Sequence, residues 1–142
     1  MLDRPERIIL VEDDQVFAQV ITRSFEKKGF LVAHASNSKE ALTLIQNRGF
    51  EYAILDLNLG GETSLKLIPA FKKIVTDIQI LILTGYASIA TAVEAIKLGA
   101  DNYLAKPADA DEIISAMINK NKQISENLEI SKTSIPMSVQ RV

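Results

Sequence analysis

The chain has 142 residues, the usual length of one domain or of one domain with a short extension. Hydrophobic residues make up 47% of it and charged residues 24%, which excludes a disordered or fibrous chain. The absence of cysteine excludes disulfides and thiolate zinc sites, and the single histidine excludes multi-histidine metal sites. A net charge of -2 leaves no basic surface for nucleic acid over the whole chain. No apolar run is long enough to cross a membrane, so we expect a cytoplasmic protein.

Apolar, β-branched runs alternate with amphipathic helical patterns over the first 119 residues. Runs that are apolar at consecutive positions are typical of strands buried on both faces, and glycines follow several of the helical patterns. In chain order, we predict a strand at 8–11, a helix at 15–28, a strand at 30–33, a helix at 38–48, a strand at 52–55, a helix at 64–74, a strand at 78–83, a helix at 88–98, a weaker strand at 102–104 and a helix at 109–119. This alternation predicts an open, doubly wound parallel α/β sheet with helices on both faces.

Local signals refine the ends of three helices. Ser38 and Asp109 are predicted N-caps, because their side-chain oxygens can accept from the first free amides of a helix. Pro69 lies inside the third helical pattern and predicts either a kink or a later start.

Polar side chains follow four of the predicted strands. Ligands bind beyond the carboxyl ends of strands in such sheets. The residues found there are Glu12, Asp13 and Asp14 after the first strand, Asp56 after the third, Thr84 after the fourth and Lys106 after the fifth. Carboxylates without histidine or cysteine favour a hard, oxygen-binding cation such as Mg²⁺. Taken alone, Glu12, Asp13 and Asp14 would more simply form a solvated loop that caps the following helix. The presence of Asp56, Thr84 and Lys106 at other strand ends instead favours a binding site.

Four segments carry a resemblance to a known family. They are Val11-Glu12-Asp13-Asp14, Leu55-Asp56-Leu57-Asn58, Leu83-Thr84-Gly85-Tyr86 and Tyr103-Leu104-Ala105-Lys106-Pro107. Residues 7–119 resemble the receiver domain of two-component response regulators, and the segments around Thr84 and Lys106 are similar to the RegA/PrrA/ActR redox-responsive subfamily. The resemblance implies a flavodoxin-like, CheY-like fold with five parallel strands in the order 2-1-3-4-5 and five helices.

The resemblance also implies a role for each site residue. Asp56 would accept a phosphoryl group from a phosphohistidine of a sensor histidine kinase. Asp13, Asp56 and the main-chain carbonyl of Asn58 would hold Mg²⁺, with Glu12 acting mainly through a water. Lys106 and the Thr84 hydroxyl would each contact a phosphoryl oxygen, and Tyr103 would be the aromatic residue that turns inward when Thr84 moves.

Residues next to these positions have secondary roles in this interpretation. The peptide bond before Pro107 is a candidate cis bond. Asn58 and Tyr86 lie where the family tunes the lifetime of the phosphoryl group, and Gly85 leaves room beside Thr84. We expect His34 to have a surface or edge-strand role, because no second histidine exists to help it bind metal or transfer phosphate.

The loop after the acceptor departs from the family pattern. Many receivers carry a proline four residues after the acceptor and a glycine eight after it, whereas this chain has Gly60 and Ser64. The adjacent glycines at 60 and 61 predict a more mobile loop near the site.

The chain divides into a predicted receiver domain at 1–119 and a linker or helical extension at 120–142. Residues 136–142 resemble the segment that leads into the DNA-binding helices of the RegA/PrrA/ActR regulators, where a helix-turn-helix follows. We therefore expect DNA binding only through a C-terminal domain outside this sequence. A continued last helix would align Met117, Ile124 and Leu128 as a dimer seam, and a frayed linker is the alternative. Ile89, Val93 and Ile96 are a second candidate surface for pairing on phosphorylation, although core packing explains most of them.

Three other functions are alternatives to the receiver. A haloacid dehalogenase-type phosphatase needs an acid two residues after its nucleophile, where this chain has Asn58. A flavodoxin-like electron carrier needs a phosphate loop after the first strand, where this chain has acids that would repel phosphate. A receiver that binds partners without being phosphorylated remains open. The chain is not expected to be an enzyme beyond catalysing its own phosphorylation and dephosphorylation.

Overall fold

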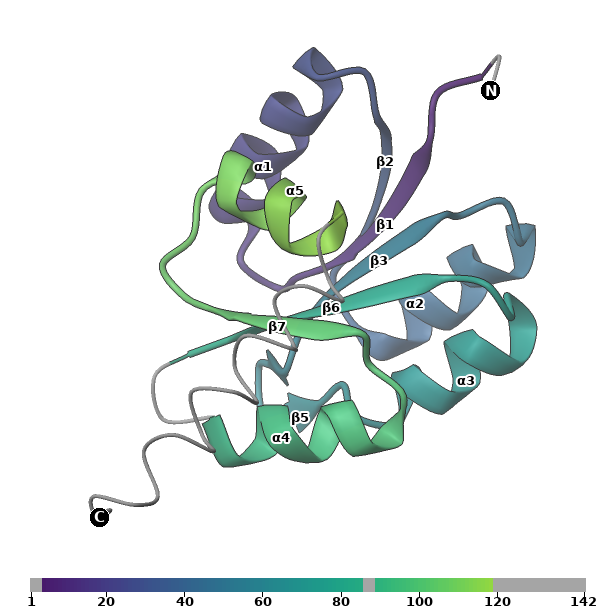
Figure 1. The fold of residues 1–142 in the computed structure, drawn as a ribbon, viewed down its shortest axis with the longest axis vertical. Helices are drawn as coiled ribbons and strands as arrows, with labels where there is room; N and C mark the ends of the chain where they lie inside the picture. The colour runs from purple at the N-terminus through teal and green to yellow at the C-terminus, as the bar shows by residue number, and fades with distance from the viewer. Residues whose placement is uncertain (1–3, 86–88, 119–142) are drawn as a thin grey trace, which may run out of the picture.

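The computed structural model describes residues 4–85 and 89–118. Its main sheet is parallel throughout, with strand order β2-β1-β3-β6-β7 (Figure 1). The strands are β1 (Arg7–Val11), β2 (Leu31–Ala35), β3 (Tyr52–Asp56), β6 (Gln79–Thr84) and β7 (Asn102–Ala105). Counting only these five strands along the chain, the order is 2-1-3-4-5, which confirms the predicted fold.

Helices cover both faces of the sheet. The α1 helix (Gln15–Lys27) and the α5 helix (Ala110–Ile118) lie together on one face (Figure 1). The opposite face carries α2 (Ser38–Leu44) with the short 3-10 turn η1 (Ile45–Asn47), α3 (Leu67–Ile74) and α4 (Ile89–Leu98). The structure is therefore the doubly wound arrangement that the alternation of patterns predicts.

The apolar strands pack on both of their faces. In β1, Ile8 and Leu10 belong to the core beneath α1 and α5, whereas Ile9 and Val11 belong to the core beneath α2, α3 and α4. Successive side chains of a strand point to opposite faces, so a strand between two helical layers needs apolar residues at every position. This requirement explains the continuous apolar runs in the sequence.

Two predicted helices have different boundaries in the structure. The second is shorter than 38–48, because its last turn is the 3-10 turn and Arg48 has a left-handed backbone with φ of 62°. The third begins at Leu67 rather than at residue 64. Pro69 is then the third helical residue, where a missing N–H costs no hydrogen bond within the helix. Of the two alternatives for Pro69, the later start is confirmed.

One predicted N-cap is confirmed and the other is wrong. Asp109 Oδ1 accepts from the amide of Glu112, and Glu112 Oε1 accepts from the amide of Asp109, both at 2.9 Å, which is a capping box. Ser38 is instead the first residue of α2, and Asn37 caps the helix by accepting from the amide of Glu40 at 2.9 Å. Either residue type caps helices well, so the sequence alone does not separate adjacent candidates.

The loop after Asp56 forms a small antiparallel hairpin. Strand β4 (Asn58–Leu59) pairs with strand β5 (Glu62–Thr63), and Gly60 and Gly61 form the turn between them. Their φ values of 64° and 102° fit a two-residue hairpin turn, which favours glycine at both positions. The glycines therefore have a structural use in the turn, and greater mobility of this segment stays a prediction.

Several predictions concern the last helix, α4 and the segments beyond them. Met117 is only 3% exposed and packs in the core under α1 and α5, so its predicted place in a dimer seam is wrong. Val93 is exposed, whereas Ile96 packs against the core. Tyr86, the side chain of Ile89 and the predicted extension at 120–142 lie outside the described residues. No helix in the described ranges is long and apolar enough to cross a membrane.

Candidate functional site

The predicted site residues meet at the carboxyl edge of the sheet. Glu12 follows β1, Asp56 is the last residue of β3, Thr84 is the last residue of β6, and Lys106 follows β7. Parallel strands end at the same edge, so residues far apart in the sequence come together there. The Lys106–Pro107 peptide bond is cis, as predicted.

Three carboxylates form an acidic cluster at this edge. One oxygen of each of Glu12, Asp13 and Asp56 lies within 4.8 Å of the others. Glu12 is 1% exposed and Asp56 is 7% exposed, whereas Asp13 is exposed. Oxygen donors at this spacing fit a hard divalent cation, which would also relieve the repulsion among the carboxylates.

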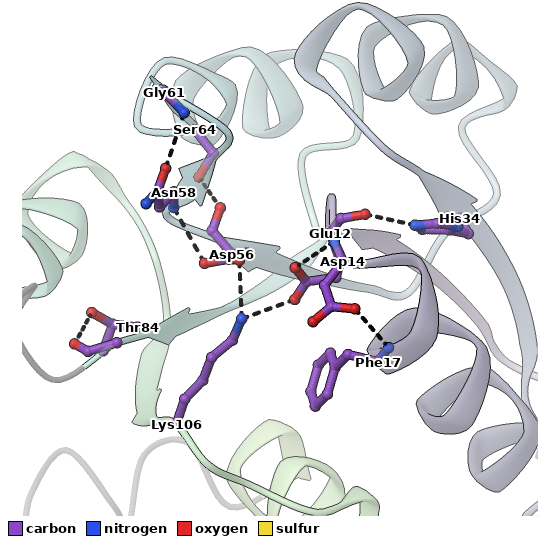
Figure 2. Close-up of polar contacts among 11 residues, drawn as sticks. Glu12, Asp14, Phe17, His34, Asp56, Asn58, Gly61, Ser64, Thr84 and Lys106 are labelled. Carbon is purple, nitrogen blue, oxygen red and sulfur yellow. Dashed lines mark hydrogen bonds and ion pairs between the residues drawn. The ribbon is translucent and has the colours of Figure 1, made fainter.

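Lys106 is the cation that faces this cluster. Its Nζ lies 3.0 Å from Glu12 Oε1 and 3.0 Å from Asp56 Oδ2 (Figure 2). The same ammonium lies 5.1 Å from the centre of the Phe17 ring, a distance at which a cation is attracted to an aromatic face. One ammonium thus serves two buried carboxylates, and the cluster keeps an excess of negative charge.

The cluster shifts the pKa values of two of its groups. Burial raises the pKa of Glu12 to about 7, and the neighbouring Asp56 carboxylate adds to the rise, while hydrogen bonds from Asp14 and Lys106 offset part of it. Burial lowers the pKa of Lys106, but hydrogen bonds to Asp56 and Glu12 outweigh it, so the pKa is raised overall. The lysine therefore stays charged, and Glu12 takes up a proton more readily than an ordinary glutamate.

Glu12 is held through its main chain by the edge strand β2. Its amide donates to the carbonyl of Ala35 at 2.9 Å, and its carbonyl accepts from His34 Nε2 at 2.7 Å (Figure 2). The amide of Asp14 donates to Glu12 Oε2 at 3.1 Å. The edge-strand role of His34 is confirmed, and the structure adds that its ring fixes the main chain of a site residue.

Asp56 is held by the segment that follows it. The amide of Asn58 donates to Asp56 Oδ1 at 3.2 Å, and the Ser64 hydroxyl donates to the Asp56 main-chain carbonyl at 2.8 Å (Figure 2). The side chain of Asn58 is occupied within the hairpin, where its Oδ1 accepts from the amide of Gly61 at 3.3 Å. The carboxylate of Asp56 thus has partners on both oxygens, Lys106 and the Asn58 amide.

In the described part of the chain, the side chains of Thr84 and Tyr103 make no hydrogen bond to the acidic cluster. Thr84 is completely buried and its hydroxyl donates to the carbonyl of Gly85 at 3.1 Å, away from Asp56 (Figure 2). A Cβ atom built at Gly85, the next residue along the chain, would meet nothing within 4 Å, so there is open space at Gly85. Tyr103 is half-buried and packs against the core beneath α2, α3 and α4.

Comparison with known proteins identifies this arrangement. The sequence matches the family described as the response regulator receiver domain over residues 8–118. The chain belongs to the response regulator receiver family. This receiver is 38% identical to the acid tolerance regulatory protein ActR of Sinorhizobium medicae over 135 residues, which cover 95% of this chain and 67% of ActR. It is also 38% identical to the photosynthetic apparatus regulatory protein RegA of Rhodobacter capsulatus over 135 residues, covering 95% of this chain and 71% of RegA.

Solved structures support the same assignment. A response regulator from Burkholderia pseudomallei, determined with a phosphorylated aspartic acid, a calcium ion and citrate, is 44% identical to this receiver with a TM-score of 0.80. The alignment covers 87% of this receiver and 74% of that chain. A receiver domain from Clostridium thermocellum is 27% identical with a TM-score of 0.75, covering 84% of this receiver and 97% of that chain. The resemblance to receivers, and to RegA and ActR among them, is confirmed.

The sequence did not predict two residues of the site, Phe17 and Ser64. No sequence pattern assigns Phe17 to the site, because an aromatic residue on an amphipathic helix is predicted to pack in the hydrophobic core. Ser64 had a signal, since a hydroxyl stands where many receivers have glycine, but the sequence does not say where that hydroxyl points. Both act through a neighbour, Phe17 on Lys106 and Ser64 on the main chain of Asp56.

Proposed function

We propose that this receiver is a phosphorylation-activated switch of a two-component system. A sensor histidine kinase is its phosphoryl donor, and Asp56 is the acceptor. The observation that carries the proposal is the Asp56 carboxylate at the end of a buried strand, 3.0 Å from the Lys106 ammonium and beside two further acids. A solved relative from Burkholderia pseudomallei contains a phosphorylated aspartic acid, which supports the same chemistry here.

Transfer would form one bond and break another. A carboxylate oxygen of Asp56 supplies an electron pair to the phosphorus, and the bond from phosphorus to the donor's imidazole nitrogen breaks, with its electron pair leaving on that nitrogen. Such transfers need positioning and neutralisation of charge more than covalent assistance. The two hydrogen bonds to the Asp56 carboxylate provide the positioning.

The acidic cluster would hold Mg²⁺. Asp13, Asp56 and the main-chain carbonyl of Asn58 are the direct ligands in this proposal, and Glu12 acts through a water. Carboxylate and carbonyl oxygens are the donors that Mg²⁺ prefers. When bound, the cation neutralises negative charge on the acidic side chains and the phosphoryl oxygens.

Lys106 and Thr84 would contact the transferred group. The Lys106 ammonium pairs with a phosphoryl oxygen, and the Thr84 hydroxyl gives up its bond to the Gly85 carbonyl to donate to another. Tyr103 then turns inward, which changes the surface near β7 and passes the signal to an effector. A switch of this kind needs two conformations of similar free energy, between which phosphorylation selects.

The output would be regulation of transcription. ActR and RegA, which this receiver resembles over nearly its whole length, are regulatory proteins by name, and AlgB of Pseudomonas putida, 33% identical over 129 residues, is a transcriptional regulatory protein. The alignment with AlgB covers 89% of this receiver and 29% of AlgB. In this proposal residues 1–119 are the receiver and 120–142 lead to an effector that binds DNA, with pairing of two receivers on phosphorylation.

The test is phosphorylation by a small donor. The protein is incubated with acetyl phosphate and Mg²⁺, and its intact mass is measured. We expect the mass to rise by one phosphoryl group, and the adduct to be absent in Asp56→Asn and when Mg²⁺ is removed with a chelator. Asp77→Asn, which changes an acid at the opposite edge of the sheet, is the matched control and keeps the adduct.

Two results would contradict the proposal. An adduct that persists in Asp56→Asn would place the acceptor elsewhere. No adduct in the unmodified protein, together with no binding of Mg²⁺, would favour a receiver that binds its partners without being phosphorylated.

A further inference from the structure

Ser64 contacts the phosphoacceptor segment at two successive peptide groups. Its hydroxyl donates to the carbonyl of Asp56 at 2.8 Å, and its amide donates to the carbonyl of Leu57 at 3.1 Å. The residue is completely buried, so neither bond competes with water. The first bond depends on the serine hydroxyl, which the glycine expected at this position in many receivers would not supply.

A hydrogen bond to strand β6 also holds the segment that Ser64 contacts. The amide of Leu57 donates to the carbonyl of Leu83 in β6 at 3.2 Å. The peptide group between Asp56 and Leu57 is thus held at its oxygen by Ser64 and at its nitrogen by the sheet. Two partners on opposite sides of a planar peptide group leave it little freedom to rotate.

The main chain that continues from this peptide group carries the Asn58 carbonyl. In the proposed function that carbonyl is a ligand of Mg²⁺. A main-chain ligand has no side-chain torsions with which to adjust, so its direction depends on what holds the neighbouring peptide groups. Partners that orient the ligands of a metal usually influence its affinity strongly.

The hairpin that separates Asn58 from Ser64 lies beside the acidic cluster. A Cβ atom built at Gly60 would lie 3.3 Å from Asp13 Oδ2, so the turn passes close to this carboxylate. Glu62 Oε2 accepts from the amide of Ser38 at 3.3 Å, which joins the hairpin to the start of α2. The second strand of the hairpin is therefore anchored to α2 through Glu62, and the residue that follows this strand, Ser64, is anchored to the acceptor segment.

We propose that Ser64 is a positioning residue for the metal site. Its hydroxyl fixes the peptide group of Asp56 and thereby the main chain that presents the Asn58 carbonyl to the cation. This inference rests on the proposed function, because it assumes that the cluster binds Mg²⁺.

The experiment compares two buried serines in the full chain. Ser64→Ala removes the hydroxyl that donates to Asp56. Ser38→Ala removes another buried hydroxyl, which has no hydrogen-bond partner among the described residues, and is the matched control. Mg²⁺ affinity is measured by calorimetric titration. We expect Ser64→Ala to bind Mg²⁺ about tenfold more weakly, the lower end of the effect of removing an orienting partner, and Ser38→Ala to bind it as the unmodified protein does.

A conservative variant and a direct signature separate positioning from general loss of structure. Ser64→Thr keeps the hydroxyl, and we expect it to restore most of the affinity. In isotope-labelled protein, the main-chain carbonyl carbon of Asp56 should shift upfield in Ser64→Ala, because that oxygen loses a hydrogen bond, and should not shift in Ser38→Ala. This shift is visible without Mg²⁺ and thus reports the contact even if Ser64→Ala is less stable.

The outcomes distinguish this inference from the proposed function. Equal Mg²⁺ affinities for Ser64→Ala and the unmodified protein would overturn the positioning role, as would equal weakening in Ser38→Ala. An unmodified protein that binds no Mg²⁺ would contradict the proposed function itself. Weaker Mg²⁺ binding in Ser64→Ala with an unchanged carbonyl signal would also overturn the role, since the loss would then have another cause.

Discussion

A lysine pairs with carboxylate at each edge of the sheet, and the two pairs differ in their charge balance. At the amino edge, Lys72 Nζ lies 2.9 Å from Asp101 Oδ2 and also donates to the carbonyl of Ile78 at 2.7 Å. The same Asp101 oxygen accepts from the amide of Ile80 at 2.7 Å. Among the contacts of the described residues, the Lys72 ammonium has one carboxylate partner, and main-chain groups also bond to both side chains.

At the carboxyl edge the charges do not balance. Lys106 faces two buried carboxylates, Glu12 and Asp56, with Asp13 close by. Like charges at this distance repel each other, and burial adds to the cost of keeping them ionised. The comparison shows two uses of a buried charge. The ion pair at the amino edge joins elements of the fold, whereas the excess of negative charge at the carboxyl edge lowers stability and indicates a site that binds a cation.

The largest expected effect comes from removing the lysine at the unbalanced edge. Lys106→Met should slow phosphorylation by acetyl phosphate by about 10²–10³-fold, because a positioned charge that stabilises a transition state has about this influence on rate. Lys72→Met is the matched control and should be phosphorylated at the normal rate. The rates are measured by intact mass over time. Slow phosphorylation in both variants would contradict a specific role of Lys106 in the reaction.

The raised pKa of Glu12 predicts that stability depends on pH. The folded pKa is about 7 and that of an ordinary glutamate about 4.5, so the stability from this group is full below about pH 4.5 and is lost as the pH rises through about 7. The free energy of unfolding should fall by roughly 3 kcal/mol over this window. Urea denaturation at several pH values in the presence of a chelator measures the decline.

Substitution of either of two glutamates tests this assignment. Glu12→Gln should flatten the decline, because the group no longer titrates. Glu51→Gln should leave it unchanged. Burial alone would raise the pKa of Glu51, but hydrogen bonds from the Arg7 amide and Arg4 outweigh it and lower the pKa, so its contribution is lost only as the pH falls below the ordinary value. A decline that survives in Glu12→Gln would assign the pH dependence to another group.

A smaller effect is expected from the balanced pair. Lys72→Met removes the ammonium that pairs with Asp101 and should lower the free energy of unfolding by about 2 kcal/mol, a usual value for a hydrogen bond to a charged group. The loss is measured by urea denaturation, and it should appear without any change in Mg²⁺ affinity. Weaker Mg²⁺ binding in this variant would contradict a purely structural role for the amino-edge pair.

The smallest effect concerns the aromatic rings beside two cations. Phe17→Leu removes the ring near Lys106 and should slow phosphorylation roughly two- to fivefold, since such contacts contribute about 0.5–1 kcal/mol. Phe50 is the matched control, because its ring lies 4.3 Å from the guanidinium carbon of Arg7 at the opposite edge. Phe50→Leu should lose stability and keep the normal rate. Equal phosphorylation rates for Phe17→Leu and the unmodified protein would show that the Phe17 ring does not act on the reaction through Lys106.

Much of the fold and the outline of the site could be predicted from local patterns. Asp56 follows the buried run at 52–55 directly, and this placement alone puts a carboxylate at the end of a strand. Errors arose where two local signals compete. Ser38 and Asn37 are both good caps, and Met117 suits an exposed seam as well as a buried core, so only the packed neighbours separate the alternatives.

The sequence by itself determined the alternation of strands and helices, the strand ends that carry acids, and the hydroxyl at Ser64. Only the tertiary structure decided the partners of these groups. Lys106 meets Glu12 across 94 positions of sequence, and the Ser64 hydroxyl selects the carbonyl of Asp56. The physical reason is that burial and turns follow from the chemistry of neighbouring residues, whereas the direction of a polar side chain follows from packing among segments that the sequence keeps far apart.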